Sequence, residues 1–132
     1  MPASPKSRHL AKLAADAALD KLATDVTLID VSSRFPLSDM FVIASAANHR
    51  QVKAVCEGIE KALSVEGVKP LNREGQSDSH WILLDYEEIV VHVQLAEDRD
   101  YYSIERLWKD CPIEVVMQRQ HLTLIRQSIA HS

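Results

Sequence analysis

The chain has 132 residues, of which 46% are apolar, a formal net charge of −4 and two cysteines. This size suits one domain with an ordinary core, and no run approaches the ~20 apolar residues that a membrane span needs. The first thirteen residues lack the apolar stretch of a secretory signal, so we expect a cytoplasmic protein without membrane association. Cys56 and Cys111 lack zinc-ligand spacing, so we expect one buried and one surface thiol and no disulfide framework.

Charge is distributed unevenly along the chain. Lys6, Arg8 and Lys12 make the first dozen residues positive, whereas residues 74–114 contain eleven acidic residues against three basic ones. An acidic surface repels phosphate backbones and attracts basic proteins, so we expect little direct contact with nucleic acid and a basic protein as partner. A solvated acidic face without any partner is the simpler alternative.

The first half of the chain predicts two helices and two strands. Ser4 before Pro5 is typical of a helix start, and apolar residues recur at helical spacing to about Ala23. Residues 26–31 predict a strand, and the continuously apolar residues 40–44 predict a central one. A second helix follows, with Asn48 as its N-cap and an apolar stripe of Val52, Val55, Cys56, Ile59 and Leu63. A short strand around residues 69–71 should lie at an edge, because Pro70 has no N–H to donate.

Residues 81–93, WILLDYEEIVVHV, have the pattern of a β-hairpin in the middle of a sheet. With Tyr86 and Glu87 as a two-residue loop, Trp81 would lie opposite His92. Side chains alternate along a strand, so the hairpin has one aliphatic core face and one mixed face. The aliphatic face is Ile82, Leu84, Ile89, Val91 and Val93, and the mixed face is Trp81, Leu83, Asp85, Val90 and His92.

Acidic residues then precede a short amphipathic helix that ends near Trp108. The order of elements predicts an α+β fold: a single mixed β-sheet of about five strands with two main helices and a short C-terminal helix. We expect one domain over residues 1–109 and a tail of uncertain structure over residues 110–132.

A search for catalytic or metal-binding motifs finds one alternative function. Asp98 and Asp100 have the Asp-x-Asp spacing of metal-dependent nucleotidyltransferases, but they open a helix, where the helix dipole explains them. His80 and His92 fall on opposite faces of the hairpin and cannot share an ion. With only three glycines, no phosphate-binding loop can be written. We therefore expect no catalytic residue, metal or cofactor, and keep a nucleotidyltransferase-like enzyme as the alternative.

Four motifs resemble the ribosomal silencing factor family, also called RsfS or Iojap-related. They are SDMFVIASAANHRQV at residues 38–52, EG at 74–75, WILLDYEEIVVHV at 81–93 and DRDYYSIERLW at 98–108. The resemblance implies a sheet of nucleotidyltransferase-like topology without catalytic activity. It also implies a factor that binds the large ribosomal subunit through its protein fourteen, blocks joining of the small subunit and represses translation under nutrient limitation.

The resemblance places the docking surface at the hairpin tryptophan, here Trp81, and Tyr86 and Tyr102 match further motif positions. The partner-binding residues that we expect are Trp81, Leu83, Tyr86, His92 and Tyr102. Self-association through the same face into a homodimer is an alternative use of it. The family usually has glycine where this chain has Glu87, and a type I′ turn there would cost about 1 kcal/mol in positive φ.

Overall fold

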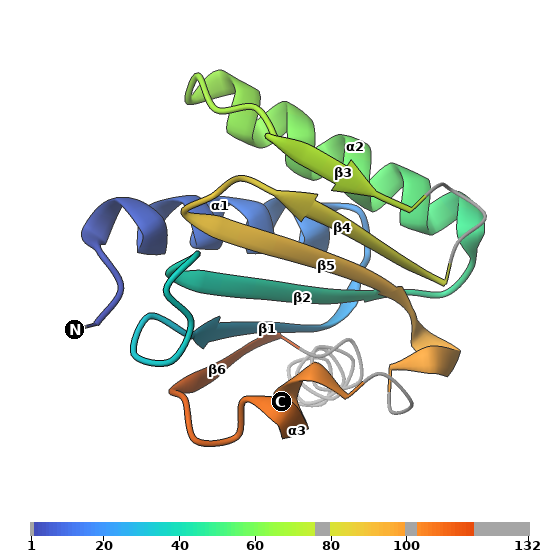
Figure 1. Ribbon diagram of the computed structural model, residues 1–132. Helices are drawn as coiled ribbons and strands as arrows, with labels where there is room; N and C mark the ends of the chain where they lie inside the picture. The colour runs from blue at the N-terminus through green and yellow to red at the C-terminus, as the bar shows by residue number, and fades with distance from the viewer. Residues whose placement is uncertain (1, 76–79, 100–102, 118–132) are drawn as a thin grey trace, which may run out of the picture.

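The computed structural model describes residues 2–75, 80–99 and 103–117, and Figure 1 shows an α+β arrangement with α1 and α2 on one face of a twisted sheet. The helices are α1 (Pro5–Asp20), α2 (His49–Val65), the 3₁₀ helix η1 (Ala96–Asp98) and α3 (Ile104–Leu107). The strands are β1 (Thr24–Asp30), β2 (Met40–Ala46), β3 (Asn72–Glu74), β4 (Trp81–Asp85), β5 (Ile89–Leu95) and β6 (Ile113–Met117). Among the described residues, no helix has both the length and the apolar character needed to span a membrane.

Side-chain caps start both long helices where the sequence predicted them. The Ser4 hydroxyl accepts a hydrogen bond from the Ser7 N–H at 3.1 Å, and the Asn48 amide oxygen accepts one from the Gln51 N–H at 2.9 Å. Each cap satisfies an N–H that has no partner within its helix. Gln51 completes the second cap by accepting the Ala47 N–H at 2.5 Å. The caps therefore set where each helix begins against the sheet.

The sheet is mixed and has six strands, in the order β3-β4-β5-β2-β1-β6, one more than expected. β2 and β5 pair in parallel, and all other neighbours are antiparallel. The additional strand, β6, lies in the segment 110–132 that we expected to be a tail. Its apolar residues Ile113 and Val115 alternate with period two, which is the spacing of a strand. The edge strand is residues 72–74 rather than 69–71, so Pro70 precedes the strand.

The β4–β5 hairpin forms as predicted, but its register was wrong by two residues. Trp81 pairs with Gln94 and Leu83 with His92, and the loop is Glu87–Glu88, closed by the Tyr86 N–H donating to the Ile89 carbonyl. Glu87 takes the positive φ of 73° that such a tight turn requires. Because the error is an even number of residues, both predicted faces are correct.

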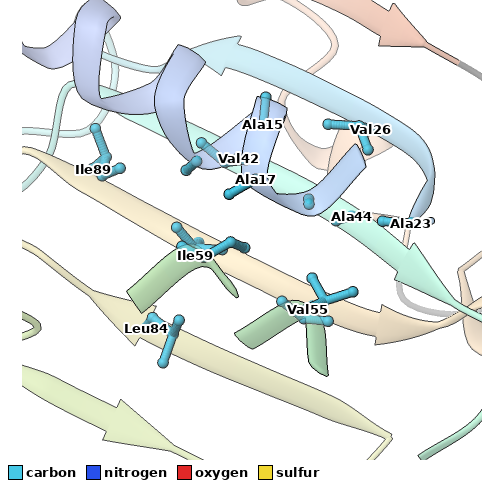
Figure 2. Packing of buried hydrophobic residues seen from close by; sticks show 14 of the residues in the cluster. Ala15, Ala17, Ala23, Val26, Val42, Ala44, Val55, Ile59, Leu84 and Ile89 are labelled. Carbon is cyan, nitrogen blue, oxygen red and sulfur yellow. The ribbon is translucent and has the colours of Figure 1, made fainter. Parts of the chain in front are cut away.

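The main core lies between the two long helices and the sheet. Figure 2 shows side chains of α1, α2 and the strands packed together, including Ala15, Val42, Ile59 and Leu84. Alanines on α1 let that helix lie close to β2 and α2. The buried residues of α2 are those of the predicted apolar stripe. Both cysteines are buried, so the expected surface thiol was wrong: Cys111 packs beside α3 on the other face of the sheet.

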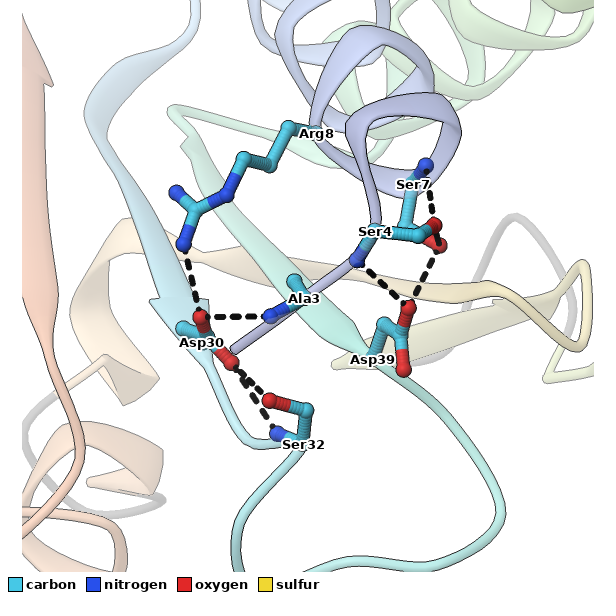
Figure 3. A network of polar contacts seen from close by, with 7 residues as sticks. All are labelled: Ala3, Ser4, Ser7, Arg8, Asp30, Ser32 and Asp39. Carbon is cyan, nitrogen blue, oxygen red and sulfur yellow. Dashed lines mark hydrogen bonds and ion pairs between the residues drawn. The ribbon is translucent and has the colours of Figure 1, made fainter. Parts of the chain in front are cut away.

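A polar network fixes the segment that precedes α1 (Figure 3). Asp30 accepts the Ala3 N–H at 3.0 Å and binds the Arg8 guanidinium at 2.9 Å, while Asp39 accepts the Ser4 N–H at 3.0 Å. Burial raises the pKa of Asp30, but hydrogen bonds from Ala3 and Ser32, with Arg8, outweigh it and leave that pKa lowered. The Ser4 N–H is the main cause of the lowered pKa of Asp39. Both carboxylates therefore hold the N-terminal segment in their ionised form.

Candidate functional site

The face of the sheet opposite the long helices carries an aromatic cluster. Phe35, from the β1–β2 connection, lies 5.5 Å from Phe41 and 5.7 Å from Trp108, measured between ring centroids. Phe41 lies 5.2 Å from Trp108 and 4.9 Å from His92, in edge contacts that aromatic rings favour. The connection and α3 thus cover the middle of this face. They leave its β4 side uncovered among the described residues, where Trp81 and Leu83 are only half-buried.

We call the outward side chains of the hairpin, Trp81, Leu83, Asp85, Val90, His92 and Gln94, the Trp81 face. The indole N–H of Trp81 donates to Nδ1 of His92 at 3.1 Å, although the two residues are not directly opposite each other. A surface cavity of about 320 Å³ adjoins Trp81 and Leu83 and is also lined by Glu74 and Gly75. This combination of a held indole and an adjacent cavity is suited to receiving an apolar group from a partner.

His92 is buried beneath Trp81 and is held in the neutral form. Burial, with a smaller contribution from the Arg99 charge, lowers the pKa of His92 to about 3. Because Nδ1 accepts the indole N–H, the ring proton of neutral His92 is assigned to Nε2, which has no hydrogen-bond partner among the described residues. His92 therefore orients Trp81 from below and is not itself presented to solvent.

Arg99 is a buried charge that anchors the segment after β5 to the sheet. Its guanidinium donates to the Ser45 hydroxyl at 2.6 Å and the Thr27 hydroxyl at 3.2 Å, and it contacts the Glu105 carboxylate at 3.0 Å. These contacts hold the Arg99 side chain against β1, β2 and α3. Nothing in the local sequence distinguishes a buried arginine from a surface one, because the burial of Arg99 depends on these contacts with distant strands.

The predicted partner-binding residues do not all share one surface. Trp81, Leu83 and His92 lie on the Trp81 face, with His92 buried. Tyr86 is 2% exposed and belongs to the core on the helix side, so the structure separates it from the Trp81 face. Burial raises the pKa of its phenol. Tyr102 lies outside the described residues.

Other residues of the matching motifs have structural roles. Asp39 binds the segment before α1, as described above, and Ser38 beside it is buried. Of the nucleotidyltransferase-like pair, Asp98 contacts His80 on the surface, and Asp100 lies outside the described residues. His80 precedes β4 and Asp98 lies in η1 after β5, eighteen positions later, so local sequence patterns do not predict their contact.

Comparisons with known proteins agree with the resemblance in the motifs. The family model described as "Ribosomal silencing factor during starvation" matches residues 4–131. The ribosomal silencing factor RsfS of Bacillus subtilis is 32% identical over 106 residues, which cover 80% of this chain and 90% of that protein. A crystal structure of a protein from Chromobacterium violaceum superposes with a TM-score of 0.74 at 35% identity, over 77% of this chain and 85% of that one.

A more distant relative is found in mouse. The mouse protein named "Mitochondrial assembly of ribosomal large subunit protein 1" is 29% identical over 89 residues, covering 65% of this chain and 39% of that protein. The family model matches nearly the whole chain, and the chain also has the α+β fold, the mixed sheet and the hairpin motif that the resemblance implied. The chain belongs to the RsfS family of ribosomal silencing factors.

Proposed function

We propose that this protein silences translation in the cytoplasm by binding the large ribosomal subunit through its protein fourteen and obstructing the joining of the small subunit. Membership of the RsfS family supports this role, and the name of the mouse relative supports the large subunit as the target. The mechanism is steric and requires no catalysis: the bound domain occupies a surface that the other subunit needs. A standard interface buries about 800 Å² on each partner, which a domain of this size supplies.

The observation that carries this proposal is the half-exposed Trp81 beside its cavity. A large aromatic ring on a surface is a typical energetic centre of an interface, since it buries much apolar area with little loss of side-chain freedom. The hydrogen bond to buried His92 holds the indole before the partner arrives, which lowers the entropy cost of binding. Leu83 extends the apolar surface along β4.

Two acidic residues lie on the same face as this apolar centre. Glu74 lines the cavity, and Asp85 ends β4 on the Trp81 face. An acidic border favours approach of a basic ribosomal protein and disfavours RNA phosphates. The charge distribution therefore supports a protein contact as the main attachment.

The test is co-sedimentation of the purified protein with separated large ribosomal subunits. Trp81→Ala should weaken binding by about 2 kcal/mol or more if the indole is a central anchor. Val65→Ala is the matched control, because Val65 is 81% exposed but lies at the end of α2, in the opposite layer. We expect this control to sediment with large subunits as the parent does. Parental co-sedimentation of Trp81→Ala, with its fold verified by circular dichroism, would exclude the assignment of the docking surface.

Light scattering of the same two variants tests self-association through the Trp81 face. If the face serves a homodimer, the parent scatters as a dimer and Trp81→Ala as a monomer, without any ribosomal component present. Subunit binding that survives in the monomeric variant would then assign the face to the dimer. We expect the opposite result, with unchanged mass and weakened subunit binding.

A further inference from the structure

Metal-ligating side chains from separate segments meet at the end of the sheet where β4 begins and β5 ends, toward the right in Figure 1. The Leu95 N–H donates to the His80 carbonyl at 3.0 Å, which places His80 beside η1. Nδ1 of His80 contacts a carboxylate oxygen of Asp98. One ligand atom from each of His80, Glu97 and Asp98 lies within 4.8 Å of the others.

A second imidazole adjoins this group. His49 is the first residue of α2, and its ring centroid lies 5.9 Å from that of His80, with the two rings perpendicular. Alternation along β4 directs His80 to the helix side of the sheet, which is the side of His49 and is opposite to Trp81. A second imidazole, at the start of α2, thus lies beside the three ligand residues His80, Glu97 and Asp98. Both imidazoles and Glu97 are exposed, so an ion can reach them without any opening of the fold.

The three side chains offer different donors to one ion. Glu97 and Asp98 each offer a carboxylate oxygen and His80 offers an imidazole nitrogen, all within the same few ångströms. A divalent ion bound there would balance both carboxylates and bind three ligands at once.

We propose that His80, Glu97 and Asp98 form a surface site for a divalent first-row transition-metal ion of the Zn²⁺ type, with His49 as the fourth ligand. Mixed imidazole and carboxylate donors are the set that such ions take in proteins, whereas Mg²⁺ and Ca²⁺ prefer oxygen alone. This site is distinct from the pair His80 and His92, which the opposite faces of the hairpin separate. It does not depend on the proposed function, because it lies on the other side of β4 from the Trp81 face.

The test is calorimetric titration of the full chain, freed of metal with a chelator, with ZnCl₂ alone. Titration with Co²⁺ adds an absorption spectrum that reports the ligand number. We expect one Zn²⁺ bound per chain, and His80→Ala and Asp98→Asn should each weaken that binding by about tenfold or more. His9→Ala is the matched control, because Nε2 of His9 contacts the single carboxylate of Glu66 at 2.6 Å on the surface. The control should titrate like the parent.

Each other outcome contradicts the proposal. The absence of heat with millimolar Zn²⁺ would exclude the site, and equal titrations of the parent and His80→Ala would place any bound ion elsewhere in the chain. Displacement of Zn²⁺ by equimolar Mg²⁺ would indicate a carboxylate site without imidazole ligands. Circular dichroism verifies that each variant is folded. Co-sedimentation of His80→Ala with large subunits separates this result from the docking proposal, since we expect that binding to be unchanged.

Discussion

The two faces of the sheet bury their side chains by different means. On the helix side, alanines and aliphatic residues of α1 and α2 pack directly against the strands, and most are completely buried. On the opposite side, aromatic rings, His92 and the Arg99 guanidinium cover the strands, and Trp81 and Leu83 of β4 stay half-exposed. The fold thus draws its stability mainly from the helix side of the sheet, and the other face can present residues to a partner. The following substitutions test this division, from the largest expected effect to the smallest.

Removing a core side chain on the helix side should cost the most stability. Ile59 of α2 is completely buried, so Ile59→Ala leaves a cavity and should lower the free energy of unfolding by about 3.5 kcal/mol. Leu83→Ala, on the half-exposed β4, should lower it by about 1 kcal/mol, since little area returns to water. Urea unfolding followed by circular dichroism measures both. Equal losses would contradict the division between the two faces.

Breaking the buried charge pair should be nearly as costly on the opposite face. Arg99→Met removes the donors to Ser45 and Thr27 and leaves Glu105 without its cation, so we expect a loss of about 3 kcal/mol in the free energy of unfolding. Arg106→Met is the control, because Arg106 is exposed on α3, next to Glu105, and should change stability by less than about 0.5 kcal/mol. Similar losses in both variants would mean that the Arg99 contacts do not stabilise the fold.

Local patterns predicted most of this fold, because alternation and helical spacing report directly on burial. The two faces of the hairpin, the caps at Ser4 and Asn48 and the stripe on α2 were all predicted correctly. The predicted register was wrong because register depends on the turn. A glutamate such as Glu87 gives no sign in the sequence that its backbone takes a positive φ. β6 was missed because its outward residues Ile113 and Val115 remain exposed, so its pattern does not mark a buried face.

The candidate site was less predictable, since it depends on contacts between distant residues. Trp81 and Leu83 could be placed on one face by parity alone. Tyr86 directly follows β4 and packs in the helix-side core. Nothing in its neighbouring sequence distinguishes it from a tyrosine on the surface. The burial of His92 likewise depends on Phe41, fifty-one positions earlier in the chain, and on the indole above it.

The buried histidine should make the Trp81 face sensitive to acid. The unfolded imidazole has a pKa near 6.5 and the folded one a pKa of about 3, so between these values the unfolded state binds a proton that the folded state does not. Stability therefore falls as the pH decreases below about 6.5, by about 2 kcal/mol at pH 5. His92→Gln should remove this part of the decrease in urea unfolding measured from pH 7.5 to 4.5.

The carboxylates of the N-terminal network do not contribute in that pH range. Asp30 and Asp39 have lowered pKa values, so their contribution to stability is also lost on acidification, but only below the ordinary aspartate pKa of 3.8. They act in the same direction as His92 in a lower pH range. A pH profile of His92→Gln that parallels the parent's between pH 6.5 and 4.5 would show that His92 is not held neutral.

The smallest effect should come from the hairpin turn, which belongs to neither face but sets the register of both. Glu87 holds φ at 73°, a conformation that costs a side chain about 1 kcal/mol and costs glycine almost nothing. Glu87→Gly should therefore stabilise the fold by up to about 1 kcal/mol, reduced by the greater freedom of glycine in the unfolded chain. Glu88→Gly, at the next position and without positive φ, should destabilise it instead. Opposite signs in urea unfolding would confirm that the strain lies at Glu87, and a loss in both variants would mean that the freedom of glycine in the unfolded chain outweighs relief of the strained φ.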